Sequence, residues 1–178
     1  MRTRVGYAGG TTPSPTYHDL ADHTEAFQLD FDPRQISYDA LLGLFWGSHR
    51  PSRGSVSRQY MPAVFAGSRA QFEDALVSRG TLASAGVLVE TPVVNGARFH
   101  LAEDYHQKYH LRHDATLMAE LERYDPRAFV DSTVAARLNG YVAGHGTLAQ
   151  LEGELESFGL SAAGATYLVA KVQQRRAR

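Results

Sequence analysis

The sequence contains no cysteine in its 178 residues. This absence excludes disulfide bonds, thiolate metal sites and a cysteine nucleophile within these residues. An excess of one charge is also missing, because 18 Lys and Arg residues stand against 19 Asp and Glu residues, for a formal net charge of −1. Without a bulk positive field, we expect no nucleic-acid partner.

Long apolar runs are missing as well. The longest, Ala40–Trp46 and Tyr167–Val172, fall far short of the ~20 residues that cross a bilayer, and the first residues form no apolar signal-peptide core. We therefore expect a cytoplasmic protein with no membrane partner. What is present is an ordinary globular composition, 43% hydrophobic and 21% charged, which argues against a disordered chain.

Strand and helix patterns alternate through the first hundred residues. In Glu25–Phe31 the residues Phe27, Leu29 and Phe31 alternate with small or polar ones, which predicts a half-buried strand. The other expected strands are Met1–Tyr7, Ala63–Ala66 and Val87–Val94, and helices are expected from Ser37 to Trp46 and from Ser68 to about Arg79. The predicted fold class is therefore α/β (α+β), with a mixed sheet of at least three or four strands and flanking helices.

Only helix patterns follow Tyr109. The expected helices are Ala115–Arg123, Thr133–Val142, Leu148–Phe158 and Ala162–Arg175. We therefore predict a core domain over residues 1–110 and an all-helical C-terminal extension over residues 111–178. The basic end, residues 171–178, suits a helix C-terminus and is expected to be solvated.

Three short clusters hold residues that are able to do chemistry. The glycines of Gly6–Gly10 let the backbone approach a ligand closely, although they also make ordinary turns. Glu25 precedes Phe27 on the same side of the expected strand; desolvation by aromatic neighbours would suit it to general acid catalysis, and the alternative is a solvated strand end. Tyr60 follows a polar loop, which is compatible with a hydroxyl that faces a cleft.

Three histidines, His106, His110 and His113, lie at positions i, i+4 and i+7 and would share one face of a helix. Three imidazoles along one helix rarely converge on one ion without help from another segment. Surface or packing histidines are therefore the expectation, and we predict neither a metal nor another cofactor. A metal-binding protein stays an alternative.

Seven motifs occur along the chain in a fixed order. They are Gly6-Tyr7-Ala8-Gly9-Gly10, Pro13–Tyr17, His23-Thr24-Glu25, Phe31-Asp32-Pro33 with Ile36-Ser37-Tyr38, Leu44-Phe45-Trp46 with His49, Gln59-Tyr60 and Ala102–Tyr109. That order resembles the A-type peptide methionine sulfoxide reductases, and the resemblance covers about residues 3–110. It implies an α/β fold, methionine sulfoxide in peptides or proteins as substrate, and protein repair under oxidative stress.

The resemblance also implies a mechanism and its residues. In this family a cysteine thiolate attacks the sulfoxide sulfur and becomes a sulfenic acid, which thioredoxin or another thiol reductant recycles, while a carboxylic acid protonates the sulfoxide oxygen. The resemblance places that acid at Glu25 and the two phenols that contact the oxygen at Tyr17 and Tyr60. His106 and Tyr109 match a segment that supports the site.

Three departures from the family pattern matter. Between Tyr17 and Glu25 the chain is shorter than the usual pattern and lacks the cysteine that is sometimes found there. A Gly-Cys-Phe-Trp segment with the nucleophile precedes the glycine motif in the family but not in this sequence, and Ser55 stands where many members have an active-site Asp. We therefore expect a gene start placed too late or a truncated chain, and no reductase activity from this exact chain. The alternative is a non-catalytic binding module that keeps the pocket of Glu25, Tyr17 and Tyr60 for oxidised methionine or another small polar ligand.

Overall fold

A computed structural model describes residues 1–55 and 57–176 of the protein, which divides into two compact units. Val5–Glu103 form one, called the sheet unit below; Met1–Arg4 and the chain from Asp104 onward form the other, called the helical unit. The expected domain division into residues 1–110 and 111–178 stays a prediction. Among the described residues, no helix is long and apolar enough to cross a membrane.

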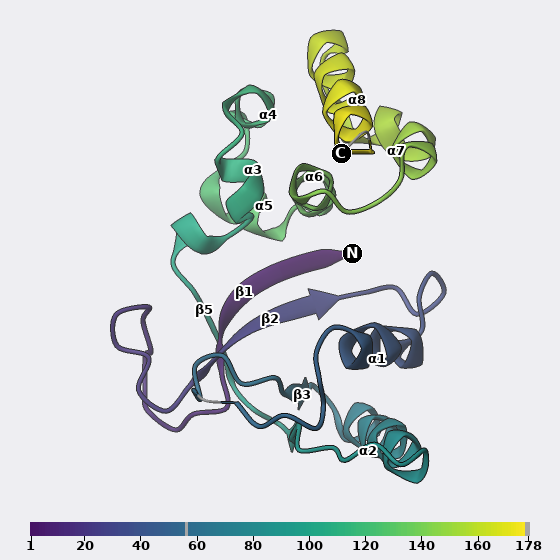
Figure 1. Ribbon diagram of the computed structural model, residues 1–178. Helices are drawn as coiled ribbons and strands as arrows, with labels where there is room; N and C mark the ends of the chain where they lie inside the picture. Colours follow the sequence, from purple (N-terminus) through teal and green to yellow (C-terminus); the bar gives the residue numbers. More distant parts are fainter. Residues whose placement is uncertain (56, 177–178) are drawn as a thin grey trace. The chain divides into compact units, whose positions relative to one another are not determined.

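A three-stranded sheet forms the first part of the sheet unit (Figure 1). Its strands, in the order β2-β1-β5, are β2 Thr24–Asp30, β1 Arg2–Ala8 and β5 Phe99–Leu101. β1 and β5 run antiparallel, with Gly6 opposite Leu101. A Cβ atom on Gly6 would lie 2.1 Å from the carbonyl oxygen of His100, so this close pairing requires glycine. The strand expected at the start of the chain is therefore confirmed.

The second part of the sheet unit combines two parallel strands with two helices that pack together (Figure 1). These elements are α1 Tyr38–Gly47, β3 Val64–Ala66, α2 Arg69–Ser84 and β4 Val93–Asn95. The Ser37 hydroxyl accepts a hydrogen bond from the Ala40 N–H at 3.1 Å, and the Ser68 hydroxyl accepts one from Gln71 at 3.2 Å. Both expected helix starts are confirmed, because each serine supplies the acceptor that a free first-turn N–H needs.

Several expectations for the sheet unit are corrected. The strands form one sheet of three and one of two. β5 was not expected, and β4 begins only at Val93, because Pro92 has no N–H to donate to a strand partner. α2 continues past Arg79 to Ser84, since a single glycine at position 80 costs too little to end a packed helix. Phe27 is 68% exposed, so the alternation in β2, an edge strand, does not mark a buried face.

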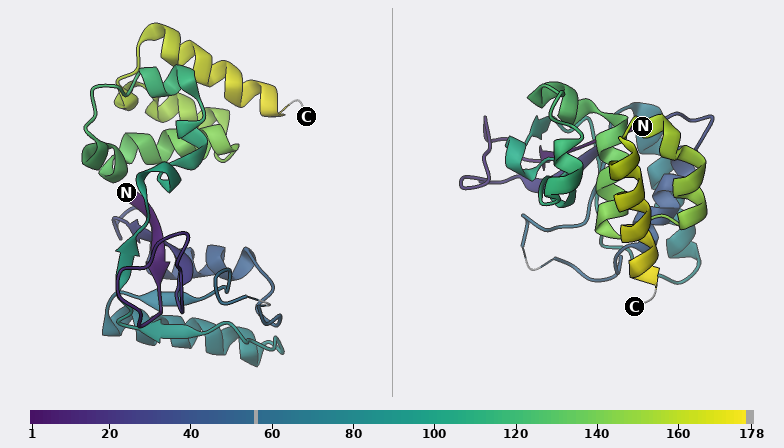
Figure 2. Two further views of the ribbon diagram at one scale, coloured as in Figure 1. Left: turned by 90° about the vertical axis from the view of Figure 1, so that its left-hand side faces the viewer. Right: turned by 90° about the horizontal axis from the view of Figure 1, so that it is seen from above.

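Short helices and one longer helix make up the helical unit (Figure 2). They are η1 Asp104–His106, α3 Tyr109–Arg112, α4 Ala115–Ala119, α5 Pro126–Asp131, α6 Thr133–Ala143, α7 Leu148–Glu154, η2 Leu155–Phe158 and α8 Ala162–Arg176. The starts at Ala115, Thr133, Leu148 and Ala162 are confirmed, and α4 ends earlier than expected. Residues 177–178 of the basic end lie outside the described residues.

α5 was not expected, and its cap explains why it forms. An Asp125 carboxylate oxygen accepts hydrogen bonds from the N–H groups of Arg127 and Ala128, both at 3.0 Å, and Pro126 occupies the first turn. Proline suits this position because its fixed φ is helical and its missing N–H would have no partner there. Six residues are too few to show a helical period in the sequence.

Candidate active site

Glu25 lies near the start of β2, beside the segment that carries Tyr60. The Glu25 N–H donates to the carbonyl oxygen of Gln59 at 2.9 Å, and the Gln59 amide Nε2 donates to Glu25 Oε1 at 2.7 Å. Two of the three expected catalytic residues thus come from segments that are directly hydrogen-bonded to each other. Glu25 and Phe27 are both exposed, so the expected desolvation of Glu25 by that ring is wrong.

Arg58 extends this connection to the glycine loop that follows β1. Its guanidinium donates to the carbonyl oxygens of Gly9, at 2.9 Å, and Asp22, while its own carbonyl oxygen accepts from the Thr24 hydroxyl at 2.9 Å. The start of β2, the glycine loop and the Gln59 segment are therefore connected through one residue, by its guanidinium and its backbone carbonyl. Sequence reasoning gave Arg58 no role, because it lies between two motifs and not inside one.

Tyr17 is 41% exposed on the loop between β1 and β2, and Tyr60 is 63% exposed. The backbone N–H of Tyr17 donates to Glu103 Oε1 at 3.0 Å, and the Tyr7 hydroxyl donates to Glu103 Oε2 at 2.7 Å. Glu103 therefore fastens the Tyr17 backbone to β1. Its signal in the sequence is the Ala102–Tyr109 motif, which contains this glutamate but does not by itself indicate its hydrogen-bond partners.

Asp22 holds the same loop from its other end. Its carboxylate accepts hydrogen bonds from the Thr11 N–H at 2.7 Å, the Thr11 hydroxyl at 2.9 Å and the Thr12 N–H at 3.1 Å. The Thr11 and Thr12 backbone N–H groups hold the pKa of Asp22 well below its ordinary value. The loop is thus anchored to an ionised carboxylate across the physiological pH range.

His106 and Tyr109 belong to the helical unit. His106 ends η1, and Tyr109 opens α3, where its exposed ring lies 4.2 Å from the His113 ring between centroids. Lys108, between them, has a left-handed backbone with φ 54°, so His106 and His110 do not share one continuous helix face. Within residues 1–55 and 57–176, no group of three His, Asp or Glu side chains is placed to hold a metal ion.

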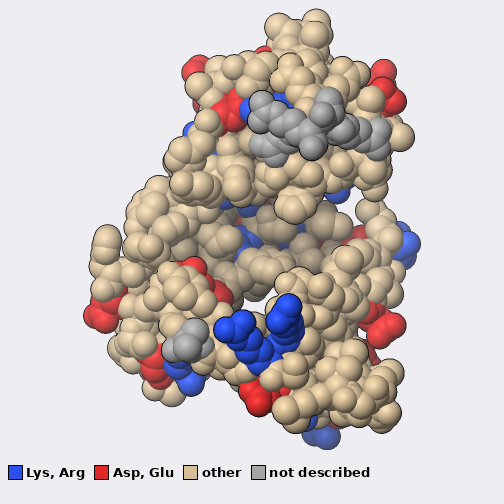
Figure 3. Space-filling view, viewed as in Figure 1, with Lys and Arg blue, Asp and Glu red and all other residues tan. Residues whose placement is uncertain are grey.

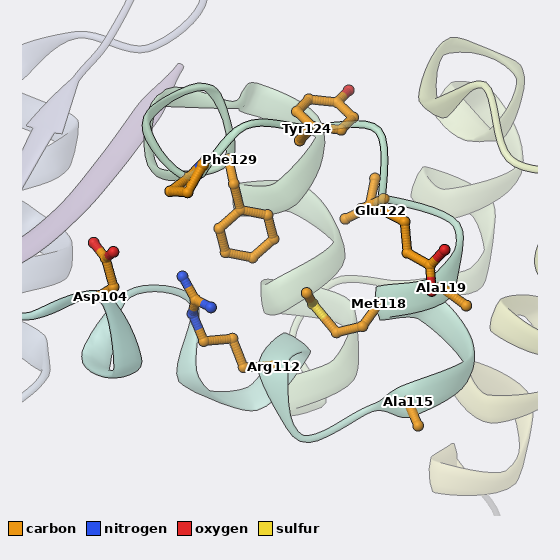
Figure 4. A pocket seen from close by; sticks show the side chains of 10 residues that line it. Asp104, Arg112, Ala115, Met118, Ala119, Glu122, Tyr124 and Phe129 are labelled. Carbon is orange, nitrogen blue, oxygen red and sulfur yellow. The ribbon is translucent and has the colours of Figure 1, made fainter.

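A hollow of about 500 Å³ lies within the helical unit, away from any residue expected in the site (Figure 4). Asp104, Arg112 and Glu122 bring charge to its lining, and Met118 and Phe129 are among its apolar walls. The Arg112 guanidinium lies 4.6 Å from the centroid of the Phe129 ring, where the ring face attracts it. Arg112 therefore already has an aromatic partner in the protein itself.

The charged side chains on the surface shown in Figure 3 occur in small groups of both signs. This distribution agrees with the formal net charge of −1. That face therefore presents no broad field of one sign.

The fold and the motif residues point to one class of enzyme-related protein, and comparison with known families identifies it. Residues 1–137 match the family described as peptide methionine sulfoxide reductase, and residues 128–165 match the helical domain of selenoprotein methionine sulfoxide reductase A. The chain belongs to the peptide methionine sulfoxide reductase family. The resemblance found in the seven motifs is therefore confirmed.

Individual relatives carry the same family name. A peptide methionine sulfoxide reductase of Drosophila melanogaster is 36% identical over 177 residues, which are 98% of this chain and 72% of that protein. Peptide methionine sulfoxide reductase A5 of Arabidopsis thaliana is 35% identical over 80% of this chain and 59% of that protein. The MsrA protein of Ectopseudomonas mendocina is 41% identical over 60% of this chain and 55% of that protein. The chain thus spans between 55% and 72% of these relatives' lengths.

Solved structures share the fold. Methionine sulfoxide reductase A of Corynebacterium diphtheriae has a TM-score of 0.50 and 28% identity, covering 70% of this chain and 66% of that one. Reduced Mxr1 of Saccharomyces cerevisiae has a TM-score of 0.54 over 69% of this chain and 73% of that one; at 24% identity it supports the fold alone. The predicted α/β class is confirmed.

Proposed function

We propose that this chain supplies the oxygen-side half of a methionine sulfoxide reductase site, acting on methionine sulfoxide in peptides or proteins. Glu25 is the proton donor to the sulfoxide oxygen, and the Tyr17 and Tyr60 hydroxyls bind that oxygen as its negative charge develops. His106 and Tyr109 support the site. The observation that carries the proposal is the paired hydrogen bonding of Glu25 with Gln59, which brings the Tyr60 segment to the acid in a chain of this family.

The reaction needs a thiol from outside these 178 residues, because the sequence contains no cysteine. Reduction of a sulfoxide in this way transfers oxygen to a nucleophilic sulfur, which becomes a sulfenic acid, and no other side chain here forms and regenerates that species. Thioredoxin or another thiol reductant would complete the cycle. A cytoplasmic location fits this proposal, since thiol reductants keep that compartment reducing; fractionation of cells with an antibody to the chain tests it.

The second candidate is a binding module that recognises the sulfoxide without reducing it. The missing cysteine favours it over a complete enzyme. The intact mass of the native polypeptide separates the two proposals. A free thiol on a polypeptide heavier than 19.6 kDa supports the reductase, whereas a thiol-free polypeptide of 19.6 kDa supports the binding module.

Ligand binding tests the site itself. Calorimetry with N-acetyl-methionine sulfoxide methylamide is expected to show binding of one sulfoxide epimer and none of the unoxidised methionine compound. Tyr17→Phe and Tyr60→Phe should each weaken binding about tenfold, because each removes one hydroxyl donor to the oxygen. Tyr124→Phe, at a half-buried tyrosine of the helical unit outside the motifs, is the matched control. Equal binding of sulfoxide and thioether would contradict the assignment.

A turnover assay gives the complementary result. The purified chain should show no reduction of methionine sulfoxide with dithiothreitol, measured by chromatography of the released methionine compound. Reduction of a single epimer by a metal-free preparation would disprove the requirement for an outside thiol.

A further inference from the structure

His23 lies one residue from the start of β2 and is 1% exposed, although imidazole is a polar group. Both of its ring nitrogens are hydrogen-bonded to the glycine loop. The Gly10 N–H lies 3.3 Å from Nδ1, and the Thr12 carbonyl oxygen lies 2.8 Å from Nε2. No mechanism step given above uses this side chain.

These two partners determine the protonation state of the ring. A backbone N–H only donates, so Nδ1 must present its lone pair to Gly10; a carbonyl oxygen only accepts, so Nε2 must carry the proton. His23 is therefore the neutral Nε2–H tautomer. A second proton on Nδ1 would place a donor against the Gly10 donor and break that hydrogen bond.

Gly10 is fitted to this ring. A Cβ atom there would lie 2.5 Å from the His23 ring carbon Cδ2 and 2.5 Å from Asp22 Oδ1. No larger residue fits between the imidazole and the carboxylate without moving one of them. The sequence allowed two roles for the glycine motif, a loop that approaches a ligand and an ordinary turn. At Gly10, the missing side chain makes room for the His23 ring.

The loop that His23 contacts continues directly to Tyr17. Only residues 13–16 separate Thr12 from Tyr17, and Pro13 and Pro15 among them have a fixed φ. Tyr17 is held at its backbone N–H by Glu103. A shift at Thr12 therefore has few free torsions to absorb it before Tyr17.

We propose that neutral His23 is a positioning residue, which holds Gly10 and Thr12 so that the loop presents the Tyr17 hydroxyl to the sulfoxide oxygen. This proposal rests on the proposed function for its ligand and on the hydrogen bonds of His23 for its mechanism. Its consequence is that loss of the Nδ1 acceptor releases the Gly10 N–H and loosens the loop.

Other charged groups face the ring and set the controls. Asp22 Oδ1 lies 3.9 Å from Nε2, and the His100 ring lies 5.1 Å away between centroids. Burial, with the charge of Arg98, lowers the pKa of His100. Arg58 donates to the Asp22 carbonyl oxygen. Because His100 is the aromatic neighbour of the ring, His100→Gln is the control for changes at this contact.

Nuclear magnetic resonance on the full chain tests the two hydrogen bonds of His23 without a ligand. Long-range nitrogen–proton spectra should show the Nε2–H tautomer for His23. The Gly10 amide should be protected from exchange, because Nδ1 accepts its hydrogen bond, and His100→Gln should leave this protection in place. An unprotected Gly10 amide in wild type, or an Nδ1–H tautomer, overturns the proposal.

Variants of His23 separate positioning from a merely structural role. In His23→Asn the side-chain oxygen replaces Nδ1 as the acceptor, so Gly10 stays protected. His23→Leu removes both bonds and should lower Gly10 protection about tenfold. His145→Asn, at an exposed histidine of the helical unit, is the matched control. Because His23→Asn retains the hydrogen bond from Gly10, the proposal can still be tested if His23→Leu does not fold.

Binding of N-acetyl-methionine sulfoxide methylamide completes the test. His23→Asn should bind as tightly as wild type, because it keeps the acceptor for Gly10, and His23→Leu should bind about tenfold more weakly. Absence of binding by wild type overturns the proposed function alone, because the exchange and tautomer results stand without a ligand. Unchanged binding by His23→Leu, with Gly10 unprotected, overturns the positioning role.

Discussion

The two units of the protein are stabilised by different interactions. Among the described residues, the helical unit has an apolar cluster with twelve buried members, and the sheet unit has one with four. The four are Leu42, Trp46, Val64 and Ala75. The segments that carry the candidate site are held instead by hydrogen bonds that involve the side chains of Asp22, His23, Arg58 and Glu103. Each such bond contributes only about 1 kcal/mol net, so single changes can reposition the site without unfolding the helical unit.

A phenylalanine in the helical core tests this contrast with the largest expected effect. Phe129 is 4% exposed, and Phe129→Ala removes a buried ring together with the surface that Arg112 covers. We expect the free energy of unfolding to fall by about 3–5 kcal/mol. Urea unfolding followed by far-ultraviolet circular dichroism measures it. A loss below about 1 kcal/mol would show that the helical unit does not depend on its apolar cluster.

Lys108 tests a buried charge in the same unit. Its Nζ donates to the carbonyl oxygens of Thr3 and Val130, and burial lowers its pKa to about 8, with Arg4 adding to the shift. Between pH 8 and its ordinary 10.5 the unfolded chain therefore binds more protons than the folded one, so stability should rise with pH in this window. The gain is about 3 kcal/mol.

Denaturation at pH 7.5 and pH 10 measures this gain, which Lys108→Met should abolish. Lys171 is the matched control lysine. Hydrogen bonding to Asp114 raises its pKa, so it contributes no gain in stability in this pH window. A rise of equal size in wild type and in Lys108→Met would assign the effect to other groups.

Asp114 tests the polar contribution within the helical unit. Its carboxylate caps α4 through the Leu117 N–H at 3.1 Å and pairs with Lys171 at 2.8 Å. Burial acts to raise its pKa, but the hydrogen bonds from Lys171 and Leu117 outweigh this and lower it. Asp114→Asn should cost about 1–3 kcal/mol near pH 7.

The pH dependence of that cost has a defined sign. A lowered pKa gives stability that is present above the ordinary carboxyl value of 3.8 and is lost as the pH falls through the folded value. The difference in the free energy of unfolding between wild type and Asp114→Asn, measured in urea, should therefore shrink as the pH falls below 3.8. Asp39→Asn, exposed in the first turn of α1, should change stability by under about 1 kcal/mol.

Phe27 provides the smallest expected effect and the counterpart of Phe129. It is exposed in β2, so Phe27→Ala should change the free energy of unfolding by less than about 0.5 kcal/mol. The same urea experiment measures it, repeated at several protein concentrations. A loss above about 2 kcal/mol that grows with concentration would mean that association between chains covers this ring.

Local signals in the sequence predicted the parts of the fold that depend on neighbouring residues. Ser37 and Ser68 start helices because their hydroxyls reach N–H groups only three residues ahead. The helix starts at Thr133 and Leu148 are likewise confirmed. The motif residues Glu25 and Tyr60 were found by their order in the chain, and their roles stay predictions.

The sequence by itself determined the family, the fold class and the absence of a thiol, because residue identity and order are sufficient for each. Only the tertiary structure decided that Phe27 is exposed, that β5 pairs with β1, and that His23 is a neutral ring held by Gly10 and Thr12. These outcomes depend on which distant segments meet. A three-residue strand or a histidine beside a loop has no local period that reveals its partner, so long-range hydrogen bonding had to supply it.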